Sequence, residues 1–290
     1  MANYGMVIDV NRCVGCYSCF LACRDEHVGN DHLPVSLGQP AVDQRWIDVR
    51  EHERGSFPKV KVDYVPVPCL HCSDAPCIDA ATGGAIYRRD DGIVVIDPAK
   101  AAGQRELVAA CPYRVIFWNE VRNVPQKCTL CAHLLDEGWK EPRCAEVCPT
   151  QAIVFGDLAD PHSDIAKLCA AKRVGELHPE FETKPRVRYL GLPKRFIAGE
   201  VVLADDSNRP AEGIDVILNG GAGRLTTQTD NYGDFEFDDL DEQMEYRLAV
   251  EHRGYRRHEV AIPVGACLNL GVIVLDPARN QSRGHRQRQR

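Results

Sequence analysis

The sequence predicts an α+β chain with a cysteine-rich N-terminal half and a C-terminal antiparallel β-sandwich. Two observations lead to this prediction. Twelve of the 14 cysteines fall in four groups between residues 13 and 148. From about residue 195, seven short alternating runs are separated by turn residues. The expected divisions are a cysteine-rich domain over 1–160, a connecting arm over 161–194, the sandwich over 195–276 and a disordered basic tail over 277–290.

Composition and charge exclude several classes of protein. The 290 residues are enough for two domains, and the net charge of -7 gives no reason to expect nucleic acid as a partner. No apolar stretch is long enough to span a bilayer, and the N-terminus lacks the basic and apolar regions of an export signal. We therefore expect a cytoplasmic chain with no direct membrane insertion. In such a chain, 14 cysteines favour metal ligation over disulfides.

The first cysteine group has the C-x2-C-x2-C-x3-C spacing of bacterial ferredoxins. Three thiolates on a tight loop can face three irons of one cubane cluster, and the fourth points to a different cluster. The alternatives, a disulfide knot or a zinc ribbon, fit less well because zinc sites use separate C-x2-C pairs. A strand over 5–10 is expected before the loop and a short helix over 19–27 after it. The four cysteines are Cys13, Cys16, Cys19 and Cys23.

The second group follows a stretch without strong periodicity. Residues 28–58 are expected to be an irregular insertion, and 59–67 a strand. Three cysteines then have C-x2-C-x4-C spacing: Cys69, Cys72 and Cys77. Two short runs joined by Asp91-Gly92 predict a hairpin, the element that normally separates two cluster loops of a ferredoxin.

The third group contains a single cysteine, Cys111. When Cys111 is aligned with the fourth ligand of the first group, the other ligand positions hold Ala101, Gln104 and Leu107, and the crossing position in the second group holds Ala81. All four gaps then belong to one site. Another register in residues 100–111 is the alternative, and it leaves the set containing Cys111 unchanged. One complete ligand set therefore remains: Cys69, Cys72, Cys77 and Cys111.

The fourth group is a ferredoxin run with an insertion between its second and third cysteines. Because paired runs exchange their fourth ligands, the remaining thiols form two more sets. One is Cys13, Cys16, Cys19 and Cys148; the other is Cys23, Cys128, Cys131 and Cys144. Twelve cysteines thus fill three [4Fe–4S] clusters, in two ferredoxin-like units formed by 1–27 with 113–160 and by 59–112.

Several other residues have no assigned role. Cys169 and Cys267 stand apart and are expected to be buried as small hydrophobes. Lys127 and Arg143 directly precede ligands, where they would either raise a cluster's potential or be solvated. Three histidines lie near cysteine loops and could hydrogen-bond a sulfide or take a ligand place: His27, His71 and His133.

The C-terminal part follows a helix expected over 163–172. Its alternating runs are 196–203, 214–218, 224–229, 234–237, 246–252, 257–262 and 268–275. The turn from Thr229 to Gly233 and the later Gly254-Tyr255 resemble the transthyretin-like or carboxypeptidase-regulatory-like domain. The region has no clustered histidines, carboxylate pair or activated nucleophile, so we expect a packing or docking surface.

The cysteine groups together resemble a known family. Their order, with the stretches 88–98 and 126–136 and the C-terminal sandwich, resembles the iron–sulfur small subunits of the dimethyl-sulfoxide-reductase family of molybdopterin enzymes. The resemblance is greatest to the transhydroxylase and resorcinol-hydroxylase type. The sequence departs from that pattern in the insertion at 28–42, in the Arg-rich tail and around Cys148.

The resemblance implies a catalytic partner. A large subunit would hold molybdenum or tungsten with two pterin guanine dinucleotides, and this non-catalytic chain would pass electrons between that centre and an external donor or acceptor. An aromatic polyol substrate is implied by the same resemblance. The alternatives are a mainly structural subunit of a redox-neutral transhydroxylase, a free ferredoxin-like carrier, and an electron-transfer subunit of a membrane-linked sulfur-compound or dimethyl sulfoxide reductase.

Overall fold

A computed structural model describes residues 2–206, 209–221, 223–265 and 267–278. The chain divides into two compact units. The first contains Met1–His52 and Asp63–Leu192; the second contains Glu53–Val62 and Pro193–Arg290. The tail expected over 277–290 lies, from residue 279 onward, outside the described residues. Within the described chain, no helix combines the length and the apolar character needed to cross a membrane.

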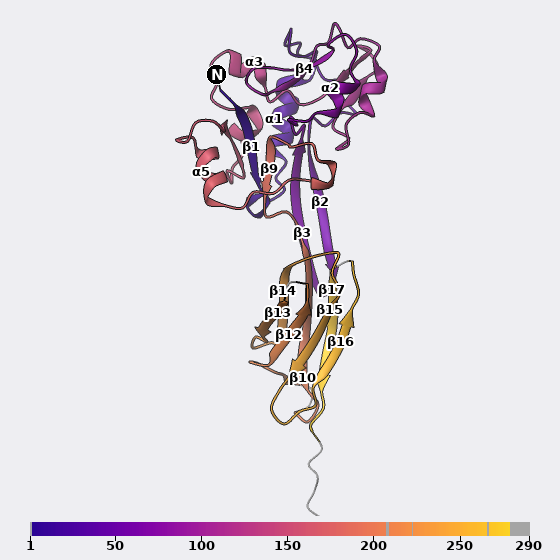
Figure 1. Cartoon of the computed structure of the whole chain (residues 1–290), viewed down its shortest axis with the longest axis vertical. Helices are drawn as coiled ribbons and strands as arrows, with labels where there is room; N and C mark the ends of the chain where they lie inside the picture. Colours follow the sequence, from indigo (N-terminus) through magenta and orange to yellow (C-terminus); the bar gives the residue numbers. More distant parts are fainter. Residues whose placement is uncertain (1, 207–208, 222, 266, 279–290) are drawn as a thin grey trace, which may run out of the picture. The chain divides into compact units, whose positions relative to one another are not determined.

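The first unit contains a three-stranded sheet, of which β1 (Tyr4–Asp9) and β9 (Val187–Leu190) lie side by side in Figure 1. The central strand β1 pairs antiparallel with β8 (Ile153–Asp157) and parallel with β9. The strand predicted over 5–10 is confirmed. The structure differs from the expected connecting arm at β9, because residues 187–190 add an edge to this sheet. The sheet therefore joins the first and last segments of the unit.

Two hairpins lie between the cysteine groups. The predicted hairpin is confirmed as β4 (Ile86–Arg88) and β5 (Val94–Ile96), and Gly92 in its turn has φ +89°. A second hairpin, which the sequence analysis does not predict, joins β6 (Phe117–Asn119) to β7 (Val124–Gln126). The strands of the second hairpin have only three residues each, so their alternation is too short to be read from the sequence. The first hairpin was predictable because Asp91-Gly92 marks its turn.

The helices of this unit are short, as expected where loops must wrap around compact sites. Both predicted helices are confirmed, as α1 (Ser18–His27) and α5 (Asp164–Ala171). The Ser163 hydroxyl caps α5 by accepting the Ala166 N–H at 3.1 Å. The remaining helical segments are α2 (Pro76–Ala80), α3 (Ala132–Asp136), α4 (Arg143–Glu146), η1 (Val10–Arg12), η2 (Arg105–Val108) and η3 (Pro179–Phe181).

The expectation of an irregular insertion over 28–58 is wrong in its second half, which forms the first strand of a long hairpin. Strand β2 (Ile47–Ser56) precedes β3 (Lys59–Pro68), and the two form a two-stranded sheet. Strand β3 confirms the run predicted over 59–67. In β2, only Ile47 and Val49 are buried, and the following residues are charged or polar. The alternation is therefore too weak to mark this strand in the sequence.

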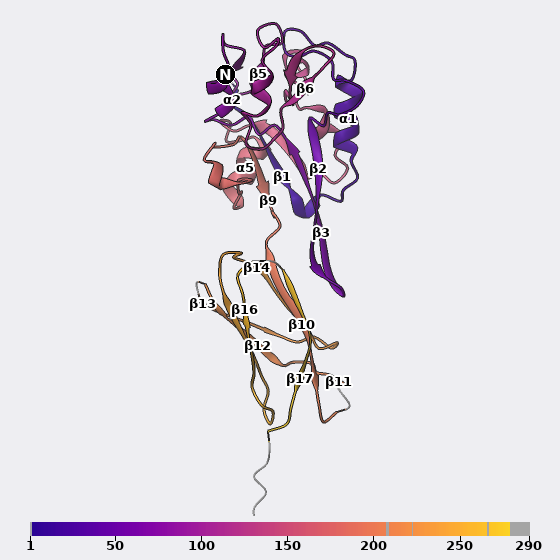
Figure 2. The ribbon, with the colours of Figure 1, turned by 90° about the vertical axis from the view of Figure 1, so that its right-hand side faces the viewer.

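The second unit contains two four-stranded sheets, seen as separate layers in Figure 2. Ile197, Val216 and Leu248 are among the buried side chains that form one core between them. One sheet contains β10 (Arg195–Leu203), β11 (Arg209–Pro210), β14 (Asp234–Leu240) and β17 (Leu268–Leu275). The other contains β12 (Asp215–Gly220), β13 (Gly223–Gln228), β15 (Tyr246–Glu251) and β16 (His258–Ile262).

All seven strands predicted in this region are present. The two-residue β11 is additional, because so short a segment has no detectable period. The pairing pattern differs from the purely antiparallel expectation at one place, since β10 and β17 pair in parallel. The other pairings within these two sheets are antiparallel.

Candidate metal centres

The first predicted ligand set lines one cavity. Cys13 and Cys16 come from the loop between η1 and α1, Cys19 from the first turn of α1, and Cys148 follows α4. Gly15 has φ +65°, and a Cβ there would lie 2.6 Å from the Tyr64 ring, so this turn requires glycine. On the far side, the Ala152 N–H donates to the Cys148 sulfur at 3.2 Å. The loop and the end of α4 therefore bring four thiols around one space. They are Cys13, Cys16, Cys19 and Cys148.

The second predicted set lines another cavity. Its thiols come from the loop after β3, from α2 and from the turn after η2. Pro76 is in the first turn of α2, where its missing N–H has no helical partner to lose. This short helix carries the third cysteine of the group toward the first two. The four thiols are Cys69, Cys72, Cys77 and Cys111.

The third predicted set is the most deeply buried. Helices α1 and α4 pack together and supply one thiol each, and the loop before α3 supplies two. Burial raises the pKa of the Cys144 thiol well above its usual value, and repulsion from the other three members raises it further. The four thiols of this set therefore lie near one another. They are Cys23, Cys128, Cys131 and Cys144, and all four are buried.

These gathered thiols have the chemistry expected of a soft-metal site. Burial raises the pKa of Cys19, Cys72 and Cys131 to about 12. Burial also raises the pKa of Cys77 and Cys128 to about 11, and neighbouring thiols contribute in each case. Four clustered thiols that resist ionisation are stabilised as thiolates only by a bound cation. An iron–sulfur core is such a group, so the donor set fits it.

An unpartnered polar atom supports the same fit. His71 is 1% exposed, and its Nδ1 accepts the Val94 N–H at 3.0 Å. The proton of this neutral imidazole is therefore on Nε2, which has no hydrogen-bond partner in the described chain. His71 also lines the cavity of Cys69 and Cys111. A sulfur atom of a cluster in that cavity would accept the Nε2–H.

The three sets adjoin one another in a row. Cys19 of the first set raises the pKa of both Cys23 and Cys144, although burial is the larger cause. Cys69 has the same effect on Cys128, after burial, and its backbone also hydrogen-bonds the Cys128 sulfur. The set of Cys23, Cys128, Cys131 and Cys144 thus lies between the other two.

Three of the four positions that lack cysteine belong to an apolar cluster. Ala101 and Leu107 are fully buried in an apolar cluster with Ile86 and Val94, and Ala81 packs against it. Gly103 has φ +81°, which matches the left-handed Gly15 with which it aligns. This region retains the backbone form of a ligand loop but has a hydrophobic core where sulfur would be.

A histidine cluster adjoins Cys131. His27 Nε2 lies 3.7 Å from the Cys131 sulfur, and burial lowers the His27 pKa to about 3. His133 Nε2 hydrogen-bonds Glu26 at 3.0 Å, and the His133 ring stacks on His32 with centroids 3.7 Å apart. His27 and His133 are named from the sequence, whereas His32 is not, because the segment that holds it has no periodicity.

Glu26, His32 and His133 offer three metal-ligand atoms close together. The two stacked rings are nearly parallel, with 16° between their planes. One ion between them would lie far out of both imidazole planes, whereas a histidine lone pair lies in the ring plane. This cluster is therefore better described as a hydrogen-bonded packing group than as a metal site.

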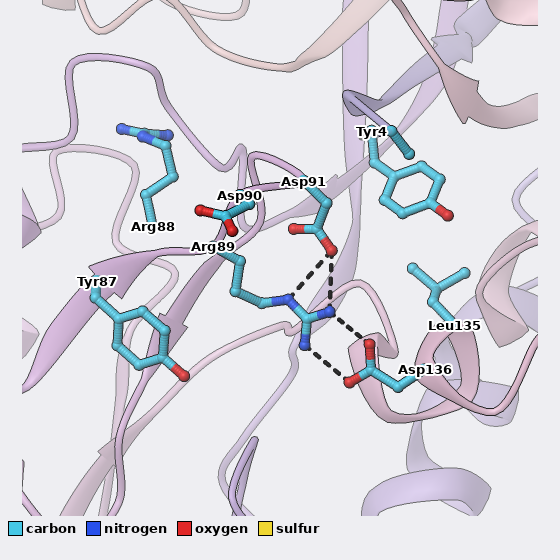
Figure 3. A pocket seen from close by; sticks show the side chains of 9 residues that line it. Tyr4, Tyr87, Arg88, Arg89, Asp90, Asp91, Leu135 and Asp136 are labelled. Atoms are coloured by element: carbon cyan, nitrogen blue, oxygen red, sulfur yellow. Dashed lines mark hydrogen bonds and ion pairs between the residues drawn. The ribbon is translucent and has the colours of Figure 1, made fainter.

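A polar surface pocket lies beside the β4–β5 hairpin (Figure 3). In it, Arg89 forms two hydrogen bonds with the Asp136 carboxylate, at 2.9 and 2.5 Å. A third runs from Arg89 Nε to Asp91 at 3.1 Å. The guanidinium is thus offset by two carboxylates, and the pocket has no excess positive charge with which Arg89 could attract an anion.

The two remaining cysteines lie outside the three sets. Cys169 packs against a small cluster that contains Val7 and Ile165. Cys267 accepts the Phe196 N–H at 3.4 Å in the second unit. Both thiols are half-buried, not buried as expected, and their contacts agree with structural roles.

Comparison with known proteins places this architecture in a family. Residues 60–158 match the 4Fe–4S dicluster domain. The chain is 39% identical over 282 residues to the pyrogallol hydroxytransferase small subunit of Pelobacter acidigallici, covering 95% of this chain and 100% of that protein. It is 36% identical to a putative iron–sulfur subunit of dimethyl sulfoxide reductase from Halobacterium salinarum (66% and 79% covered) and to a tetrathionate reductase subunit from Salmonella typhimurium (67% and 75%).

The first of these relatives is matched over its whole length, well above the identity at which a shared fold is expected. The other two are named as subunits of reductases. The chain belongs to the iron–sulfur small subunits of the dimethyl-sulfoxide-reductase family of molybdopterin enzymes.

Proposed function

We propose that this chain is the electron-transfer subunit of a molybdopterin enzyme and that it carries three [4Fe–4S] clusters. The observation that supports this most directly is the grouping of 12 of its 14 cysteines into three sets of four. The proposed ligands are Cys13, Cys16, Cys19 and Cys148; Cys23, Cys128, Cys131 and Cys144; and Cys69, Cys72, Cys77 and Cys111. Clusters so ligated supply single-electron transfer.

The three ligand sets lie in a row, so the proposed electron path through the chain has two ends. The middle set is buried, whereas Cys16 at one end is exposed and hydrogen-bonds Ser18 at 3.4 Å. Around that end, Val14 and Leu21 are each 62% exposed. An exposed apolar surface beside a ligand loop is suited to contact with another protein. We therefore propose this end as one of the two places where electrons enter or leave the chain.

The proposed partner is a large catalytic subunit that holds molybdenum or tungsten on molybdopterin guanine dinucleotide. The relative matched over its full length is named as the small subunit of a pyrogallol hydroxytransferase, so an aromatic polyol is the proposed substrate of the complex. The chain itself would be non-catalytic. We also propose a cytoplasmic location for the complex and an external electron donor or acceptor.

The second unit is proposed to serve as a packing or docking domain of the transthyretin-like or carboxypeptidase-regulatory-like type. Its support is the pair of sheets around a single core. The proposed domain limits are residues 1–160 and 195–276, and residues 161–194, expected as a connecting arm, supply α5 and β9 to the first unit.

Iron analysis and electron paramagnetic resonance of the anaerobically purified complex test the proposed function. We expect about twelve irons per chain and signals that appear on reduction with dithionite and with substrate. A zinc-loaded or disulfide-linked chain would contradict the cluster assignment. Steady turnover in which no cluster is ever reduced would contradict the electron-transfer role and favour a structural subunit.

A further inference from the structure

Three cationic residues directly precede ligand cysteines. Arg12, before Cys13, is exposed to solvent, and the structure separates the roles of the other two. Arg143, before Cys144, has a partly exposed side chain. Its guanidinium pairs with Glu146, and its Nε lies 3.5 Å from Glu26. Two carboxylates therefore offset the Arg143 charge, and solvent screens what remains.

Lys127, before Cys128, has a different environment. It is only 2% exposed, and its ammonium donates to the carbonyl oxygens of Val94 and Cys128, the latter at 3.1 Å. Across the described ranges of the chain, no carboxylate forms an ion pair with it. A buried charge whose partners are all neutral is strongly unfavourable unless an opposite charge lies nearby.

The cavity beside Lys127 supplies the position of that opposite charge. Lys127 lines the space enclosed by Cys69, Cys72, Cys77 and Cys111. Its Nζ also donates to the carbonyl oxygen of Cys128, which belongs to the middle set. The ammonium therefore lies between two neighbouring ligand sets.

We propose, on the basis of the proposed function, that Lys127 is the fixed counter-charge of these two clusters and raises their reduction potentials. A cluster that accepts one electron gains one negative charge, and a buried cation stabilises that reduced form more than the oxidised form. The low-dielectric surroundings make this effect larger than that of a solvated lysine. The electron then resides preferentially on the middle cluster and on the one ligated by Cys111.

The consequence is a difference in potential along the row. Lys127 adjoins the set of Cys69 and the set of Cys128, but it does not line the cavity of Cys13 and Cys148. The cluster at the Cys13 end does not receive this stabilisation. The charge of Lys127 therefore makes it the weakest electron acceptor of the three. The charge of Lys127 determines which clusters hold the electron, and Lys127 contacts no substrate.

The test is a potentiometric titration of the intact complex followed by electron paramagnetic resonance. In Lys127→Met, the midpoint potentials of the middle cluster and of the Cys111 cluster should shift to more negative values, and that of the Cys13 cluster should stay unchanged. Iron content should remain that of the wild type. Lys127→Arg keeps the charge and should restore the wild-type potentials.

The matched control is Lys184→Gln. Lys184 is exposed and pairs with Asp74 at 2.8 Å, so this variant loses the same formal charge without changing any potential. If Lys127→Met destabilises the complex, Lys127→Gln, which keeps one donor for Val94, provides the same measurement. Unchanged potentials in a neutral variant with full iron content would overturn the role of Lys127 and leave the proposed function intact. A wild-type complex without reducible clusters would instead overturn the proposed function.

Discussion

The side chain of Gln104 forms two hydrogen bonds with the backbone of Thr82. It accepts the Thr82 N–H at 3.2 Å and donates to the Thr82 carbonyl at 3.3 Å. Thr82 follows Ala81, and both Ala81 and Gln104 occupy positions where a second cluster of this unit would have ligands. The hydrogen bonds of Gln104 and the packing of Leu107 thus hold together two segments that a second cluster would otherwise link.

Replacing Leu107 tests this packing. Leu107 is fully buried, so Leu107→Ala should lower the free energy of unfolding by about 2–5 kcal/mol, through lost burial and the cavity left behind. Denaturant unfolding of the metal-loaded chain measures the loss. Glu106→Ala, on the adjacent exposed residue, is the control and should change stability by no more than about 0.5 kcal/mol. Equal effects of the two variants would show that no packed core replaces the fourth site.

Single cysteine variants test the ligand sets. Cys77→Ser and Cys111→Ser should remove the same resonance signal and about four irons per chain, because both thiols line one cavity. Cys267→Ser should leave the iron content unchanged, since that thiol lies in the other unit. Loss of two different signals from the first two variants would show that the pairing is wrong.

The Arg89–Asp136 pair predicts a small pH dependence of stability. Hydrogen bonds from Arg89 lower the pKa of Asp136 below its unfolded value, so the pair stabilises the fold above that value and is lost as the pH falls through the lower folded pKa. Asp136→Asn should therefore cost under about 1 kcal/mol at pH 7, since half of this side chain is exposed. The cost should vanish in acid. Unfolding at both pH values, with Asp90→Asn as the control, measures it.

In the second unit, Thr229 joins two segments through its hydroxyl. It accepts the Ile214 N–H at 2.9 Å and donates to the Ala211 carbonyl. Thr229→Val keeps the shape but leaves two buried groups unpaired, so it should cost about 1–3 kcal/mol or more. Thr226→Val, on an exposed position of β13, is the matched control. Thermal unfolding compares them, and a neutral Thr229→Val would contradict the assignment.

Much of the fold was predictable where one pattern dominated. The strands from Arg195 to Leu275 alternate apolar and polar residues, and each predicted run is present. Strand β2 was missed because only Ile47 and Val49 are buried, and the residues after Val49 are charged, polar or glycine. Strand β9 was missed because four residues between prolines are too few to show a period.

The candidate sites show the same division. Cysteine spacing predicted which thiols would meet, because ligand loops obey short-range geometry, and the structure gathers them as expected; their ligation remains a prediction. The state of Lys127 could not be predicted. Its burial depends on Val94, which is 33 positions away along the chain, and the sequence gives no indication that Arg143 is neutralised while Lys127 is not.

The sharing of one cavity by Cys13 and Cys148 has a consequence for biosynthesis. At ribosomal speed, the interval between the appearance of these two residues is on the order of ten seconds. Until then the first four thiols of the nascent chain have no complete site in the proposed pairing. The set that ends at Cys111 closes earlier, so iron delivery to this protein should begin at the Cys111 end of the row and finish at the segment that was translated first.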